Sequence, residues 1–166
     1  MGIAERRSDR TAVGAITAIT AVVEQGVSLP LELNGADSVS LDAVPGIGGI
    51  TAAAIIRYRE RLGGYCRKEQ VLETGVVTER NWERMREQIY ADSCAIQKID
   101  INFAAPNAVA EHPYITPRML RRILRNRQLK GGWSTIEDMT EDNTLTKEET
   151  ARLDPYLHFG PAPSVR

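Results

Sequence analysis

The sequence predicts an all-α protein built from short helices. Hydrophobic residues make up 42% of the 166 residues and aromatic residues only 5%, so the core should be aliphatic and rich in alanine. No segment alternates apolar and polar residues over the length of a strand. The chain also repeats itself, with turn residues at matching places in both copies. We therefore expect an N-terminal helix followed by two tandem helical domains, and no sheet.

The repeat defines the domain boundaries. Moving the sequence by 68 positions aligns it with itself without a gap from Asn34 to Arg84. The matched pairs include Asn34 with Asn102, Pro45 with Pro113, Ile55 with Ile123, Arg59 with Arg127, and Gly63-Gly64 with Gly131-Gly132. Chance does not hold one register over such a length. The sequence predicts domains at 31–90 and 99–158, a linker at 91–98 and a tail at 159–166.

Residues 1–30 allow two interpretations. The 13 residues from Thr11 to Val23 contain no charge and follow Arg6, Arg7 and Arg10, as in a secretory signal or a weak signal-anchor. A helix that spans a bilayer needs about 20 residues. The alternative is an ordinary amphipathic helix that packs on the rest of the chain.

Each domain is expected to contain four short helices. In the first, helices at 38–44, 51–62 and 67–73 end at glycine-containing turns, and Thr78 is an N-cap candidate for a fourth that runs to about Tyr90. In the second domain, Pro117 occupies a first-turn position. Ser134–Glu137 and Thr146–Glu149 read as capping boxes.

The most specific local pattern is Val44-Pro45-Gly46-Ile47-Gly48-Gly49. Glycines flank one buried aliphatic residue between two short helices, and this geometry points backbone N–H groups outward at the start of the second helix. Such a nest, helped by the helix dipole, binds a phosphate without any side chain. The alternative is a plain corner between two helices.

Together with Leu33-Asn34, Ala54–Arg59 and Leu62–Tyr65, this segment resembles the ComEA-type helix-hairpin-helix family. Residues 99–158 look like a diverged copy, so the resemblance covers 31–158. It implies paired hairpins in an all-α unit and weak, non-specific binding to the DNA backbone. In some members it also implies a role in DNA uptake during competence, behind a membrane anchor where Thr11 to Val23 lies here. A membrane-associated or periplasmic location is favoured over a cytoplasmic one.

Two departures from the family pattern direct attention to the arginines. Members that grip DNA carry Lys or Arg just after the hairpin glycines, whereas this chain has Gly49-Ile50-Thr51, and the second copy has no glycine at Tyr114-Ile115-Thr116. On a helical wheel, one face of the second copy instead carries four arginines. The residues expected to contact DNA are Gly46, Ile47, Gly48, Gly49, Arg57, Arg118, Arg121, Arg122 and Arg125.

Other interpretations remain for these surfaces. The four arginines could pair with the downstream acids between Glu137 and Glu149. Ile50, Ala53 and Ala54 form an outward apolar face that another protein could cover, as in a helix-hairpin-helix scaffold that has lost DNA binding. Arg59 and Arg127 fall on the apolar side and are expected to be structural, with buried stems and with their guanidinium groups on helix-end carbonyls or a carboxylate.

No enzyme, metal or cofactor is expected. Helix-hairpin-helix glycosylases that resemble this motif place a nucleophilic lysine where this chain has Ile50. The two cysteines, Cys66 and Cys94, and the two histidines, His112 and His158, do not have the spacing of a zinc site. The 21 basic and 22 acidic residues give a net charge of −1, so any DNA binding should be local.

Overall fold

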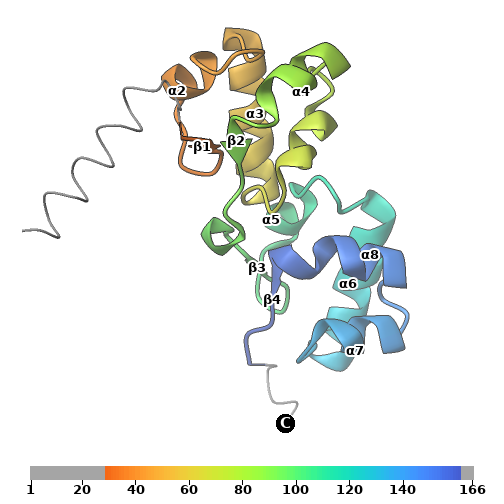
Figure 1. Ribbon diagram of the computed structural model, residues 1–166. Coiled ribbons are helices and arrows are strands. Elements are labelled where there is room, and N and C mark those ends of the chain that lie inside the picture. The colour runs from red at the N-terminus through yellow and green to blue at the C-terminus, as the bar shows by residue number, and fades with distance from the viewer. Residues whose placement is uncertain (1–28, 162–166) are drawn as a thin grey trace, which may run out of the picture. The chain divides into compact units, whose positions relative to one another are not determined.

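The computed structural model describes residues 29–161, which are mostly helical as predicted (Figure 1). From Leu31 onward they group into one compact unit. The segment from Thr11 to Val23 and the last residues of the tail lie outside the described residues. Within 29–161, no helix has the length and apolar character needed to cross a membrane.

The first half carries the four predicted helices with adjusted ends. They are α2 (Ser38–Asp42), α3 (Gly49–Leu62), the 3-10 helix η1 (Lys68–Thr74) and α4 (Glu79–Met85). Thr78 caps α4 by accepting a hydrogen bond from the backbone N–H of Asn81, as predicted. The expectation that this helix reaches Tyr90 was wrong, because Ile89–Tyr90 forms a strand.

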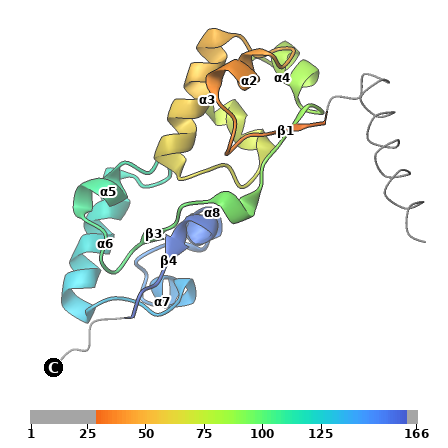
Figure 2. The ribbon, with the colours of Figure 1, turned by 90° about the vertical axis from the view of Figure 1, so that its left-hand side faces the viewer.

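The expectation of no sheet was also wrong. β1 (Leu31–Glu32) pairs in parallel with β2 (Ile89–Tyr90), and β3 (Ile99–Asp100) pairs in parallel with β4 (Leu157–His158). β3 and β4 lie side by side in both views (Figure 1 and Figure 2). Each strand has only two residues, so no alternation of apolar and polar residues could reveal it. The segment expected to be a linker contains a further 3-10 turn, Ser93–Ala95.

The second half has the same order of elements. Its helices are α5 (Pro106–Ala110), α6 (Pro117–Lys130), α7 (Ile136–Glu141) and α8 (Lys147–Leu153), followed by a 3-10 turn at Asp154–Tyr156. Pro117 lies in the first turn of α6, and the capping box of Thr146 and Glu149 is present. The other box is formed by Thr135 and Asp138, one residue later than predicted.

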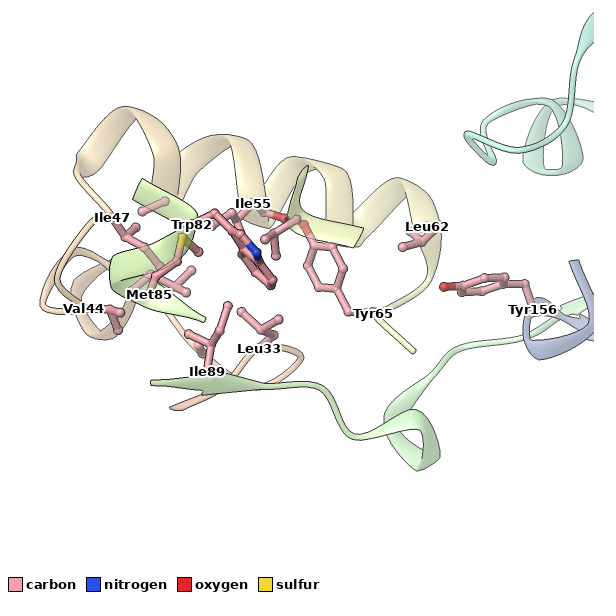
Figure 3. Packing of buried hydrophobic residues seen from close by; sticks show 14 residues of the cluster. Leu33, Val44, Ile47, Ile55, Leu62, Tyr65, Trp82, Met85, Ile89 and Tyr156 are labelled. Carbon is pink, nitrogen blue, oxygen red and sulfur yellow. Dashed lines mark hydrogen bonds between the residues drawn. The ribbon is translucent and has the colours of Figure 1, made fainter. Parts of the chain in front are cut away.

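Two hydrophobic clusters form the interior. The first gathers Leu33, Ile55, Tyr65, Trp82 and Met85 around α3, and Figure 3 shows these side chains facing one another. Tyr156 from the second half also belongs to this cluster, and its phenol points toward Leu62 at the end of α3 (Figure 3). The second cluster surrounds Ile123 of α6. Both clusters are mainly aliphatic, as the composition predicts.

Matching side chains join the loops to the helices in the two halves. Arg59 donates from Nη1 to the carbonyls of Leu33 and Ala36, both at 2.7 Å. Arg127 donates in the same way to Ile101 and Ala104, at 3.1 and 2.8 Å. The prediction that these two arginines are structural is confirmed, but the carbonyls they bind belong to the loops before α2 and α5 rather than to helix ends.

Candidate nucleic-acid interface

The first hairpin is a tight turn between α2 and α3. Gly46 has φ +94°, and a Cβ there would lie 2.7 Å from the carbonyl oxygen of Asn81. Only glycine can adopt this positive φ at low cost and also leave room for the Asn81 carbonyl, because it has no Cβ. The backbone N–H of Ile47 donates to the carbonyl of Val44 at 2.9 Å, and the Ile47 side chain is buried. The turn therefore holds the start of α3 firmly.

The start of α3 is open. Gly48 is the N-cap residue and supplies no side-chain cap, and a Cβ there would meet nothing within 4 Å. The N–H groups of Gly48, Gly49 and Ile50 have no acceptor among the described residues. Orphan donors at a helix N-terminus carry the positive end of the helix dipole. The nest expected at Gly46 to Gly49 is therefore altered, because the N–H of Ile47 is already donated to Val44 and Ile50 adds a free N–H instead.

The corresponding hairpin of the second half is closed. Thr116, at the position of Gly48, accepts a hydrogen bond from the N–H of Met119 at 3.2 Å, and Pro117 has no N–H to offer. Tyr114, at the position of Gly46, hydrogen-bonds to Gln70 and to Glu73 of the first half. This hairpin therefore packs against the first half rather than presenting donors to a ligand.

The four predicted arginines of α6 separate into two groups. Arg118, Arg121 and Arg125 are exposed, and none of them makes an ion pair within 29–161. Arg122 instead binds Glu149 of α8, with its Nη2 at 2.6 and 2.8 Å from the two carboxylate oxygens. Its side chain is 31% exposed and that of Glu149 is 25% exposed. Three arginines rather than four remain available, and pairing with a downstream acid explains the fourth.

Arg57 does not lie next to the first hairpin. It lines a shallow groove of about 190 Å³ with Arg61, Tyr58 and two residues of the turn before α4, Thr74 and Val76. That turn contains Gly75, which has φ +75° and open space around it. The structure thus places Arg57 at this second turn, between η1 and α4. Among residues 29–161, no hydrogen bond or ion pair joins this turn or the first hairpin to α6.

Sequence reasoning missed two basic residues. Arg61 lies one turn beyond Arg57 and lines the same groove, a placement that the four-residue spacing could have revealed. The Cβ of Arg84, in α4, lies 3.1 Å from the position that a Cβ on Gly46 would take. Arg84 is itself exposed. The first hairpin therefore has an arginine beside it after all. No local pattern could show this, since α4 reaches the hairpin only through tertiary packing.

The apolar face predicted on α3 is only partly open, because Ala54 is half-buried and lines the groove beside Arg57. Ile50 is 84% exposed, and Ala53 is also exposed. Val39 of α2 adds a further side chain that is 76% exposed. Within 29–161, no three His, Cys, Asp or Glu side chains are placed to hold a metal ion.

Comparison with known families agrees with the hairpin geometry. Residues 28–90 match the profile of the helix-hairpin-helix motif. No curated protein and no solved structure gives a significant match to the chain. The first half of this protein therefore contains a helix-hairpin-helix motif, which supports a general role in DNA binding.

Proposed function

We propose that this protein is a non-enzymatic, ComEA-type DNA-binding protein that holds the phosphate backbone weakly and without sequence specificity, in the setting of DNA uptake. The observation that carries the proposal is the open start of α3. Gly48 and Gly49 offer unpaired N–H groups inside a helix-hairpin-helix motif. Backbone donors at a helix N-terminus contact a phosphate but cannot read a base, so they bring affinity without specificity.

The tandem arrangement belongs to the same proposal. Equivalent residues make equivalent hydrogen bonds in the two halves. The side-chain amide of Asn34 bonds to the backbone N–H and carbonyl of Tyr65, and that of Asn102 bonds in the same way to Trp133. Residues 31–90 and 99–158 are then two copies of one domain. The first copy supplies the hairpin and Arg57, and the second supplies Arg118, Arg121 and Arg125.

The experiment is a titration of two unrelated labelled duplexes with the full-length protein, followed by fluorescence anisotropy at several salt concentrations. Equal affinity for the two sequences and a steep loss of affinity with salt are expected. The decisive variant is Gly48→Thr, whose hydroxyl would accept from the N–H of Thr51 as Thr116 accepts from Met119. Its added side chain would crowd the free N–H groups of Gly49 and Ile50, where the phosphate is proposed to bind. The backbone at Gly48, with φ −108° and ψ 173°, accepts threonine without strain.

Gly48→Thr should weaken DNA binding while leaving the melting temperature unchanged or higher. A matched control is Gly35→Ser, which changes a glycine outside the hairpin. If Gly48→Thr binds DNA as tightly as the unsubstituted protein, the hairpin is not the site. If the unsubstituted protein binds neither duplex at low salt, the proposal fails as a whole.

A second candidate function is a protein-interaction scaffold, and the exposure of Ile50 and Val39 favours it. Replacing Ile50 with Glu should then disrupt an assembly seen by analytical ultracentrifugation. Under the DNA-binding proposal, the same change adds a negative charge next to Gly49 and lowers the affinity for DNA.

A further inference from the structure

A cleft of about 530 Å³ opens where the two halves meet. No residue of the first hairpin or of α6 is among those that line it. Arg67 and Gln70 line it from the first half, and Tyr114, Arg152 and Pro155 line it from the second. Its volume falls in the range of small-molecule sites, which is about 300 to 1,000 Å³. No acidic residue is among those that line it.

The two arginines of the cleft are not neutralised by acids. Neither Arg67 nor Arg152 makes an ion pair within 29–161, and both residues are exposed. The guanidinium carbon of Arg152 lies 4.3 Å from the centroid of the Tyr114 ring. Stacking of this kind holds a guanidinium in place through its face and leaves its N–H edge free.

The groups around Arg152 are also fixed. The side-chain amide of Gln70, which is 2% exposed, donates to the hydroxyls of Tyr114 and Tyr156, each at 2.7 Å. The Tyr114 hydroxyl in turn donates to Glu73 at 2.8 Å. The Tyr114 ring therefore cannot swing away without breaking its hydrogen bonds to Gln70 and Glu73 of the first half. Arg152 is supported by a rigid platform, as a binding site requires.

We propose that this cleft binds a phosphate group through Arg67 and Arg152. Two guanidinium groups at one cleft repel each other until an anion lies between them, and the planar N–H fork of arginine matches phosphate oxygens. The volume leaves room for the group that carries the phosphate. The phosphate comes either from a free phosphate ester or from a nucleic-acid backbone, and the site is separate from the hairpin in both cases.

The test follows the arginine Nε–Hε signals by NMR while inorganic phosphate is added to the full-length protein at constant ionic strength. The Arg67 and Arg152 signals should shift and saturate, with a dissociation constant below about 1 mM. Arg152→Gln and Arg67→Gln should each weaken binding at least about tenfold, which corresponds to about 1.4 kcal/mol. Arg67 is exposed and makes no ion pair within 29–161, so Arg67→Gln remains informative if Arg152→Gln destabilises the fold.

Arg80→Gln is the matched control, because Arg80 is exposed on α4 and does not line the cleft. Shifts that never saturate, or an equal effect of Arg80→Gln, would overturn the proposal.

A second titration uses duplex DNA as the probe. A shift of Arg152 that inorganic phosphate reverses identifies the backbone as the source, while a shift with phosphate alone identifies a free ester. The backbone amide signals of Gly48 and Gly49 report binding at the hairpin in the same spectra. Binding at the cleft and binding at the hairpin are therefore tested independently.

Discussion

Neighbouring arginines on α6 should respond to the same substitution in opposite ways. Arg121 is exposed without an ion pair, whereas Arg122 is held by Glu149 at 2.6 Å. Removing Arg121 should therefore change DNA binding and leave the fold intact. Removing Arg122 should change stability and leave DNA binding intact. Comparing Arg121→Gln with Arg122→Gln therefore tests whether Arg121 serves DNA binding and Arg122 serves stability.

The magnitude follows from counting phosphate contacts. Each arginine that neutralises a phosphate adds about −0.9 to the slope of log affinity against log salt concentration. Arg57, Arg118, Arg121 and Arg125 together predict a slope of about −3.6. Between about 50 and 200 mM salt, the affinity should then fall about 150-fold. Arg121→Gln should reduce the slope to about −2.7 and the loss to about 40-fold.

Arg122→Gln should leave the slope unchanged. This substitution leaves the carboxylate of Glu149, which is three-quarters buried, without its charged partner. It should lower the free energy of unfolding by about 1 to 2 kcal/mol. Anisotropy titrations over a salt series measure the slopes, and urea denaturation measures the free energy. If Arg122→Gln reduces the slope as much as Arg121→Gln does, Arg122 leaves Glu149 to reach DNA and the assignment is refuted. If neither changes the slope, α6 does not contact DNA.

Three further predictions concern the frame that supports the site. Gly46→Ala should destabilise the protein by about 2 to 3 kcal/mol in urea denaturation, more than Gly75→Ala at about 1 kcal/mol. Both residues have positive φ, but only Gly46 faces a backbone oxygen at 2.7 Å, so equal losses would contradict this explanation. Burial lowers the pKa of His112 to about 4 from its ordinary 6.5. The unfolded chain then takes up the proton first, and stability should be full above pH 6.5 and fall by up to about 3 kcal/mol toward pH 4. His112→Val, which copies Val44, should flatten this pH profile, and an unchanged profile would exclude His112 as its cause. Asn102→Ala breaks three hydrogen bonds to Trp133 and Gly160 at a residue only 6% exposed, and should lower the melting temperature more than Leu129→Ala on the exposed end of α6.

The sequence predicted what depends on local chemistry. The glycines of the first hairpin, the cap at Thr78 and the paired roles of Arg59 and Arg127 all follow from residue types at fixed spacings. The helix-hairpin-helix motif of the first half follows from the same pattern. Asn143, 68 positions after Gly75, also has a positive φ, of +58°.

What depends on tertiary partners could not be predicted. The sequence allowed the α6 arginines to pair with the acids between Glu137 and Glu149, but it could not show that Arg122 alone would bind Glu149, 27 residues away. The position of Arg84 beside Gly46 depends on how α4 packs, and the two-residue strands depend on segments almost 60 residues apart. A helical wheel assigns a side chain to a face but cannot say which neighbour that face meets.

The short strands have a mechanical consequence. Because β1 runs parallel to β2 and β3 runs parallel to β4, tension on the two ends of either half slides its paired strands along each other. The hydrogen bonds of Leu31 to Gln88 and of Leu33 to Tyr90 then carry the load together rather than one at a time. A chain held at one end while a long polymer pulls on the other would thus meet resistance first at these bridges, before any helix is stretched.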